Sequence, residues 1–188
     1  MPDKEDLESV TYVLQIFSRN MMFRRRWPEV NTNSLLTLSI VDAPLSKWPS
    51  EVQRLRKQVF PEWFASNWFP PLFRYRGWII TARINGRLVG FALADYFEDG
   101  EELYLEEVGV CPRCQNFGFG TTIALESLKI GIARGFKYVL ATPLTGEDEG
   151  RRAEWLIRMG LPSVIGERVS ISDVLDYNKR KAERTSDS

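Results

Sequence analysis

The chain of 188 residues contains no histidine and only two cysteines, Cys111 and Cys114. The absence of histidine excludes Ser-His-Asp and Cys-His catalysis and removes the commonest transition-metal ligand. A general base must therefore be a carboxylate, a tyrosine, a lysine, a cysteine or a water. Two cysteines cannot complete a four-ligand zinc site, so we expect no metal. Their C-x-x-C spacing between a strand and a helix leaves a dithiol oxidoreductase open as an alternative.

Long apolar runs and an excess of charge of one sign are also lacking. No run reaches the roughly 18 residues that a membrane span requires, and 25 basic residues balance 25 acidic ones. We therefore expect neither a membrane nor nucleic acid as a partner. The first residues are polar and do not resemble a signal peptide, which predicts a cytoplasmic location. The length and a hydrophobic content of 44% suit a single domain with its own core.

The hydrophobic periodicity predicts a mixed α/β sheet with helices on both faces. We expect helices over residues 5–23, 50–60, 118–134, 149–159 and 173–183. We expect strands over residues 35–41, 78–84, 88–96, 102–110, 138–142 and 164–171, the last as one strand or a split pair. Asn85-Gly86 is a strong signal for a hairpin. Within the single domain, 1–188, residues 1–32 would form a variable helical extension and residues 179–188 a polar tail.

The most informative stretch joins the strand over 102–110 to the helix that follows it. From Val108 to Gly120 it reads Val-Gly-Val-Cys-Pro-Arg-Cys-Gln-Asn-Phe-Gly-Phe-Gly. A strand, a glycine turn and a helix N-terminus in that order create a pocket of backbone N–H groups, to which the helix dipole adds positive potential. Glycine at 118 and at 120 lets a ligand approach the backbone closely. The expected guest is a phosphate.

This stretch resembles the acyl-CoA-binding motif of the GNAT N-acetyltransferase superfamily, V-x-P-x-x-Q/R-x-x-G-x-G/A. The defining positions of that motif are occupied by Val110, Pro112, Gln115, Gly118 and Gly120. The resemblance runs from Trp78 to Leu161 and implies a GNAT-like, mostly antiparallel mixed sheet flanked by helices on both faces. It also implies an acyltransferase whose co-substrate is acetyl-CoA or another acyl-CoA.

The resemblance also assigns residues to the coenzyme. The expected cofactor-binding residues are Val108, Val110, Arg113, Gln115, Asn116, Phe117, Gly118, Phe119, Gly120 and Thr121. The pyrophosphate would lie over residues 115–121, and the Val110 amide would pair with the pantetheine arm or the thioester carbonyl. Many relatives carry a basic residue where this chain has Asn116, so positive charge would come from Arg113, from backbone dipoles or from elsewhere.

Glu106 and Glu107 are the candidate catalytic residues, because they lie on the strand that leads into the glycine loop. An amine acceptor with a pKa of about 10 arrives as an ammonium and must lose a proton before it attacks the thioester. Strand alternation sends the two carboxylates to opposite faces. We favour Glu106, which shares a face with Val108 and Val110, over Glu107. The plain structural alternative is two solvated strand residues.

The helix over 149–159 resembles the family's A-x-x-F-Y-x-x-x-G-F segment. Leu156 stands where the family has its general-acid tyrosine, so Tyr104, Tyr177 or a water would have to replace that acid. The alternative for Leu156 and Met159 is simple core packing. Loss of the tyrosine leaves open a GNAT-shaped module that binds acyl-CoA or a protein partner without turnover.

Two regions are candidates for the acceptor site. The aromatic-rich residues 60–78 would line a pocket for a large or apolar substrate, or plug one end of the core. The acidic residues 95–107 would attract a cationic amine, or form a solvated loop. An amine on a small molecule or on a protein fits these residues, and so do a monomer and a homodimer.

Overall fold

The computed structural model of the protein describes residues 9–13, 35–41, 49–61, 77–96, 100–141, 149–161 and 167–186. Most of the predicted aromatic segment and part of the predicted acidic segment lie outside these residues. The chain divides into two compact units. The first unit comprises residues 1–93 and 107–123, and the second comprises residues 94–106 and 124–188.

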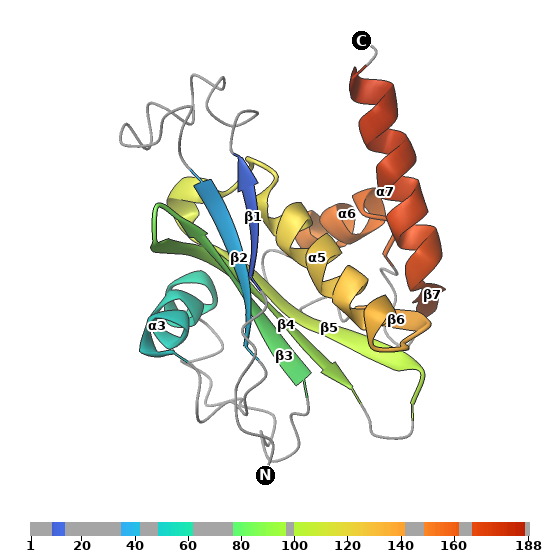
Figure 1. Ribbon diagram of the computed structural model, residues 1–188, viewed down its shortest axis with the longest axis horizontal. Coiled ribbons are helices and arrows are strands. Elements are labelled where there is room, and N and C mark those ends of the chain that lie inside the picture. Colours follow the sequence, from blue (N-terminus) through green and yellow to red (C-terminus); the bar gives the residue numbers. More distant parts are fainter. Residues whose placement is uncertain are drawn as a thin grey trace. The chain divides into compact units, whose positions relative to one another are not determined.

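The first unit is built on strands that follow one another along the chain. Strands β1 (Ser9–Val13), β2 (Leu35–Val41) and β3 (Gly77–Ile84) pair antiparallel in that order. Asn85 and Gly86, with left-handed φ angles of 49° and 79°, then turn β3 into β4 (Arg87–Tyr96), as a tight hairpin requires. Helix α3 (Ser50–Val59) lies alongside β3 and β4 in Figure 1.

The second unit holds the end of β4, the first part of β5 (Glu102–Val110) and the C-terminal elements. β5 pairs in parallel with β6 (Tyr138–Ala141), which pairs antiparallel with β7 (Arg168–Ser170). The helices are α5 (Phe119–Ala133), α6 (Glu149–Arg158) and α7 (Ile171–Ser186). Over the described residues the strands form a seven-stranded mixed sheet in sequence order. The predicted elements between residues 35 and 159 are confirmed, with ends shifted by one residue at most.

Helices cover both faces of the sheet in the first unit. On one face, Phe60 at the end of α3 packs edge-to-face on Phe91 of β4, with ring centroids 6.4 Å apart. On the other face, a Cβ on Gly90 would lie 2.7 Å from a side-chain carbon of Ile123 in α5. Because neighbouring strand residues point to opposite faces, α3 and the start of α5 lie on opposite sides of β4. The predicted fold class, a mixed sheet with helices on both faces, is confirmed.

Residues 9–13 form strand β1, so the prediction of a helix over residues 5–23 is wrong there. Apolar residues at helical spacing favoured the helix, but the segment Ser-Val-Thr-Tyr-Val is itself rich in β-branched and aromatic residues. It pairs with β2 in a register that sets Val10 opposite Leu38. Pairing with a strand edge outweighs a weak helical preference. The other residues of the predicted N-terminal extension lie outside the described part of the chain.

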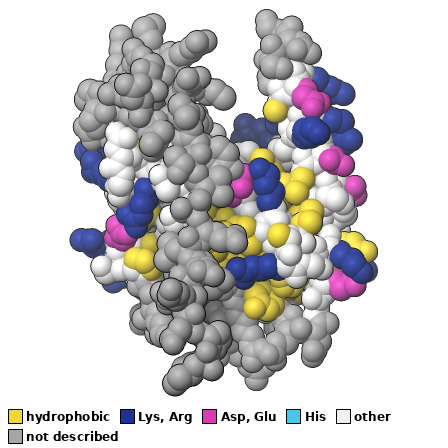
Figure 2. Space-filling model, in the orientation of Figure 1, with side chains coloured by type: hydrophobic (Ala, Val, Ile, Leu, Met, Phe, Trp, Pro, Cys, Tyr) yellow, Lys and Arg dark blue, Asp and Glu magenta, His cyan; other side chains and the backbone are white. Residues whose placement is uncertain are grey.

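The C-terminal end is more regular than the predicted polar tail from residue 179, because α7 continues to Ser186. Residues 179–186 contain neither glycine nor proline and are dominated by good helix formers. Figure 2 shows side chains of both charge signs along this helix. Two side chains of α7 cap carbonyls at the end of α6: Asn178 Nδ2 donates to Met159 O at 2.8 Å, and Lys181 Nζ donates to Arg158 O at 3.1 Å.

Candidate active site

After β5 the chain makes a short 3-10 turn, Pro112–Cys114, before α5 begins. Proline suits the first position of such a turn, because its missing N–H has no partner to lose there. The turn closes when the Cys114 N–H donates to the Cys111 carbonyl at 2.8 Å. The Cys111 N–H donates to the Val89 carbonyl on β4, also at 2.8 Å. The predicted binding loop therefore leaves the sheet from a fixed point.

Two loop residues, Asn116 and Gly118, have left-handed backbones with φ angles of 67° and 84°. Asparagine tolerates this conformation better than most residues with a side chain, which gives a structural reason for Asn116 in place of a basic residue. Both residues are exposed, whereas Phe117 and Phe119 are buried. The buried rings anchor the loop and leave its left-handed positions at the surface. A left-handed turn ahead of a helix directs successive N–H groups toward one point and favours an anion there.

The Gln115 side chain belongs to the framework of this loop. Its Nε2 donates to the Val110 carbonyl at 3.1 Å and so ties the middle of the loop to the end of β5. The predicted cofactor contact by Gln115 would therefore use its backbone, its side-chain oxygen or the second Nε2 hydrogen. The side chain has a positioning role in addition to any contact with a ligand.

Helix α5 begins directly after the loop and contributes its N-terminus. The Thr122 N–H and hydroxyl both donate to the Gly118 carbonyl, at 3.0 and 3.2 Å, so the helical hydrogen bonds start at Gly118. The first N–H groups of a helix have no acceptor within it, and the aligned dipoles of 15 residues make this end positive. The structure thus brings the predicted residues 115–121 together at a helix N-terminus suited to a phosphate.

Glu107, one of the two predicted catalytic carboxylates, is buried in an ion pair with Arg56 of α3. The exposed fractions of the two residues are 4% and 2%. Arg56 Nε lies 3.0 Å from Oε1 and 2.7 Å from Oε2, and Arg56 Nη2 also contacts Oε1. Burial raises the pKa of the Glu107 carboxyl above its usual value, and the Arg56 guanidinium opposes part of that rise.

Arg56 is a residue that the sequence reasoning missed. It lies on the buried side of α3 together with Val52 and Leu55, at positions where a helix repeats its apolar stripe. A buried arginine requires a partner, because an unpaired charge in the interior is costly. An arginine within the apolar stripe of the 50–60 helix was therefore an available signal for a buried carboxylate elsewhere in the chain.

Glu106 lies on the opposite face of β5 and is partly exposed. It is one of three carboxylates that act on the hydroxyl of Tyr104. Burial, followed by the negative charges of Glu102, Glu106 and Asp95, raises the pKa of Tyr104 above its usual value. A tyrosine with a raised pKa keeps its proton at neutral pH, which is the state that a general acid needs.

The position of the family's general-acid tyrosine, Leu156, and the other tyrosine candidate, Tyr177, lie on or near α6. Leu156 and Met159 are buried, with exposed fractions of 5% and 1%, so the core-packing interpretation is confirmed for both. Tyr177 of α7 lies against the end of α6, where a Cβ on Gly160 would approach its ring to 3.2 Å. The roles of Tyr104 and Tyr177 in proton transfer stay predictions.

A cavity of about 520 Å³ opens in the first unit, lined by α3, the start of β4 and the turn after β5. Its lining residues are Glu51, Arg54, Leu55, Gln58, Arg87, Leu88, Cys111, Pro112 and Arg113. Three arginines from three separate segments give the cavity a positive lining. The predicted cofactor contact Arg113 faces this cavity. The residues are scattered along the chain, so no local pattern could have revealed the cavity.

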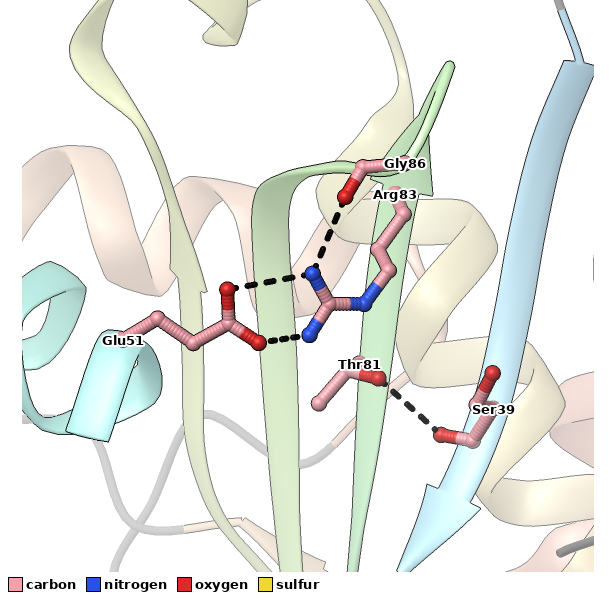
Figure 3. Close-up of polar contacts among 5 residues, drawn as sticks. All are labelled: Ser39, Glu51, Thr81, Arg83 and Gly86. Atoms are coloured by element: carbon pink, nitrogen blue, oxygen red, sulfur yellow. Dashed lines mark hydrogen bonds and ion pairs between the residues drawn. The ribbon is translucent and has the colours of Figure 1, made fainter. Parts of the chain in front are cut away.

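Among the lining residues that the structure describes, the acidic one, Glu51, is already paired. Arg83 of β3 grips Glu51 with both terminal nitrogens: Nη1 lies 3.1 Å from Oε2, and Nη2 contacts Oε1. Nη1 also donates to the Gly86 carbonyl of the hairpin turn at 3.1 Å (Figure 3). The negative charge of Glu51 is thereby balanced, and the cavity keeps its positive character.

The described residues offer neither a helix suited to span a membrane nor a cluster suited to bind a metal ion. No helix among them has both the length and the apolar character that a membrane span requires. The same residues contain no group of three or more His, Cys, Asp or Glu side chains that could hold a metal ion.

Comparison with known proteins decides the family. Residues 39–156 match the model of the Acetyltransferase (GNAT) family. The chain belongs to the GNAT acetyltransferase family. The resemblance predicted from the glycine loop is thereby confirmed. No curated protein matches the chain.

Solved structures with a similar fold share little sequence with this GNAT chain. The aminoglycoside N-acetyltransferase AAC(6')-Iy, in complex with coenzyme A, is 18% identical, with 74% of this chain and 95% of that chain covered and a TM-score of 0.54. An aminoglycoside acetyltransferase from an uncultured soil metagenomic sample is 14% identical, with 70% and 95% covered and a TM-score of 0.53. N-acetylglutamate synthase from Neisseria gonorrhoeae, complexed with coenzyme A and N-acetyl-glutamate, is 16% identical; the match covers 63% of this chain but only 27% of the synthase, with a TM-score of 0.46. The two aminoglycoside acetyltransferases, with TM-scores above 0.5, show the fold.

Proposed function

We propose that this GNAT protein transfers an acyl group, acetyl in the simplest case, from acyl-CoA to a primary amine. The observation that carries the proposal is the loop in which Asn116 and Gly118 are left-handed and exposed at the N-terminus of α5. Backbone N–H groups and a helix dipole at one point favour a pyrophosphate. Membership of the GNAT family supports the same donor. We expect the protein to act in the cytoplasm, as a monomer or a homodimer.

The acyl-CoA donor would be held mainly by backbone groups of the protein. Its pyrophosphate would contact N–H groups of residues 115–121, and its pantetheine arm would run along the face of β5 that carries Val108 and Val110. The backbone N–H of Val110 would donate a hydrogen bond to the oxyanion that forms when the amine attacks the thioester carbonyl, and would so stabilise it. Coenzyme A then leaves as a thiolate, and no covalent intermediate with the enzyme is needed.

The proton of the incoming ammonium would pass to Glu106, directly or through a water. Glu106 is partly exposed, whereas both oxygens of Glu107 are engaged by Arg56 in a buried pair. Glu107 remains the alternative base. Tyr104 lies on the same face of β5 as Glu106 and keeps its proton at neutral pH, so it is our candidate for returning a proton to the departing thiolate.

A second candidate function is binding of acyl-CoA without turnover. The observation that favours it is Leu156, a buried apolar residue where the family places its general-acid tyrosine. A leucine supplies no proton. In this case the loop would still hold the coenzyme, but no thiol would be released.

Binding is tested by calorimetric titration of coenzyme A into wild type, Gly118→Glu and Gly135→Glu. Gly118 and Gly135 both have left-handed φ angles, of 84° and 92°, so glutamate imposes a similar backbone strain at either end of α5. Only glutamate at 118 would put a side chain and a negative charge into the phosphate site. We expect Gly118→Glu to abolish binding and Gly135→Glu to retain it. Equal affinity in the two variants would contradict this placement of the coenzyme.

Turnover is tested by following free thiol after adding acetyl-CoA and a panel of amines. The panel should include aminoglycosides, polyamines, amino acids and peptides, because the similar folds of known acetyltransferases include aminoglycoside enzymes. Thiol release that depends on one of these amines supports acyl transfer and identifies the acceptor class. Binding without release from any amine supports the second candidate function.

A further inference from the structure

The two cysteines bracket the 3-10 turn after β5, one facing the arginine-lined cavity and one behind it. Cys111 is half-buried and lines the cavity, whereas Cys114 is fully buried. The 3-10 turn keeps the two residues close along the chain, because the Cys114 N–H donates to the Cys111 carbonyl at 2.8 Å. The arrangement places an accessible thiol directly in front of a second thiol that has no role in the proposed acyl transfer.

The surroundings make Cys111 the more acidic thiol, suited to act as the nucleophile, and keep Cys114 protonated. The pKa of Cys111 is lowered to about 7, mainly by a hydrogen bond from the Cys114 side chain. Burial opposes this shift, whereas backbone hydrogen bonds and the charge of Arg87 lower the pKa further. The same side-chain hydrogen bond, followed by burial and the charge of Cys111, raises the pKa of Cys114. At neutral pH the thiolate is therefore the one that faces the cavity.

The charged groups around Cys111 favour an anionic reaction partner. Arg54 of α3, Arg87 of β4 and Arg113 of the turn line the same cavity, and Glu51, the one carboxylate among the described lining residues, is neutralised by Arg83. A volume of about 520 Å³ lies within the range of small-molecule sites. A small neutral oxidant would need neither this volume nor this charge.

We propose that Cys111 and Cys114 form a reversible thiol–disulfide site that reacts with an anionic low-molecular-weight disulfide held in the arginine-lined cavity. The geometry that carries the proposal is the single 3-10 turn that the two cysteines bracket, together with the positive cavity in front of Cys111. Cytoplasmic disulfides are usually transient and redox-sensing, which suits a site of this kind.

The reaction proceeds in two exchanges. The Cys111 thiolate attacks one sulfur of the small disulfide, so that a bond from Cys111 to that sulfur forms, the bond within the small disulfide breaks, and one small thiolate leaves. Charge and hydrogen bonding from the Cys111 thiolate no longer oppose ionisation of Cys114, which loses its proton to the released thiolate or to water. The Cys114 thiolate then attacks the Cys111 sulfur and expels the second small thiolate. Overall, two protein thiols are oxidised and one disulfide is reduced to two thiols.

The covalent steps are tested by intact mass measurement after exposure of the full chain to glutathione disulfide. In wild type we expect a transient glutathione adduct followed by a product that has lost two hydrogens. Cys114→Ser should accumulate the adduct, because the second exchange is blocked, and Cys111→Ser should remain unmodified. An unmodified wild type, or an adduct that forms equally in Cys111→Ser, would overturn the proposal.

The role of the cavity is tested by a ratio of rates within each protein, so that any change in thiol reactivity common to both disulfides cancels. The rate with glutathione disulfide, an anion, is divided by the rate with hydroxyethyl disulfide, which is uncharged. Arg54→Gln should lower this ratio about fivefold, since it removes one positive charge from the cavity. Lys57→Gln is the matched control, because Lys57 is an exposed cation of the same helix outside the cavity lining, and its ratio should equal that of wild type. An equal fall in both variants, or no fall in either, would show that the cavity does not select an anion.

Discussion

Two arginine–glutamate pairs attach helix α3 to the sheet in the first unit, and they differ mainly in burial. Glu51 in the first turn of the helix binds Arg83 of β3, and the two side chains are 35% and 25% exposed. Arg56, farther along the helix, binds Glu107 of β5, and these side chains are 2% and 3% exposed. Both contacts engage both oxygens of the carboxylate.

The difference shows how burial changes the contribution of an ion pair to stability. Water screens the outer pair, so its contribution to the free energy of unfolding is of the order of 1 kcal/mol or less. The inner pair has lost its water, and removal of either partner would leave an uncompensated charge in the core. The inner pair therefore holds α3 in register with β5, whereas the outer pair adds little beyond it.

The largest expected effect belongs to the inner pair. Arg56→Met should lower the free energy of unfolding by about 3–5 kcal/mol, because it leaves the Glu107 carboxylate buried without its partner. Urea unfolding measures the change. The double variant Arg56→Met/Glu107→Leu removes both charges and should recover most of the loss. A double variant as unstable as Arg56→Met would show that the arginine acts through packing instead of charge.

The buried pair also predicts how the free energy of unfolding changes with pH. The pKa of Glu107 is raised in the folded state, so the folded protein holds this proton more tightly than the unfolded chain does. The stability from this group is therefore complete below the unfolded pKa and is lost as pH rises through the folded pKa. Arg56→Met removes a cause that lowers the pKa, so its instability should grow more steeply with rising pH than that of wild type. A parallel pH dependence of the two proteins would contradict this linkage.

A second comparison, between the adjacent carboxylates of β5, separates the two candidate bases. Glu106→Gln should lower the rate of acyl transfer by roughly a hundredfold at neutral pH and by less at high pH, where the amine loses its proton to solvent. Rate measurements across pH on Glu106→Gln and Glu107→Gln, with an acceptor amine identified as above, provide the check. A loss confined to neutral pH in Glu107→Gln would transfer the role of base to the buried residue. If the rate of each variant relative to wild type does not change with pH, neither Glu106 nor Glu107 is the base.

The smallest effect belongs to the outer pair. Glu51→Gln keeps the size of the side chain and removes the charge that Arg83 grips, so the free energy of unfolding should fall by less than about 1 kcal/mol. The loss should shrink further in high salt, where screening weakens an exposed pair. Urea unfolding at low and high salt measures both. A loss as large as that of Arg56→Met would mean that exposure does not separate the two pairs.

Local patterns predicted the strand, loop and helix from residue 102 to residue 133, because each step depends on neighbours in sequence. The glycines allow left-handed backbone, Pro112 starts the 3-10 turn, and Gly135 follows the end of α5 with a φ angle of 92°. Strand β1 was not predicted, because its conformation depends on pairing with β2, more than 20 residues away in the chain. A helical spacing of apolar residues is a weak signal when a sheet edge competes for the same segment.

By itself the sequence determined that this chain is a GNAT protein with a loop suited to a phosphate, since a short run of residues specifies that loop through its own backbone and turn chemistry. Only the tertiary structure decided that Glu107 is held by Arg56, 51 residues away, and that Cys111 faces three arginines from separate segments. The physical reason is that burial and charge pairing depend on which distant segments meet, and the cost of a buried charge appears only when the core closes around it.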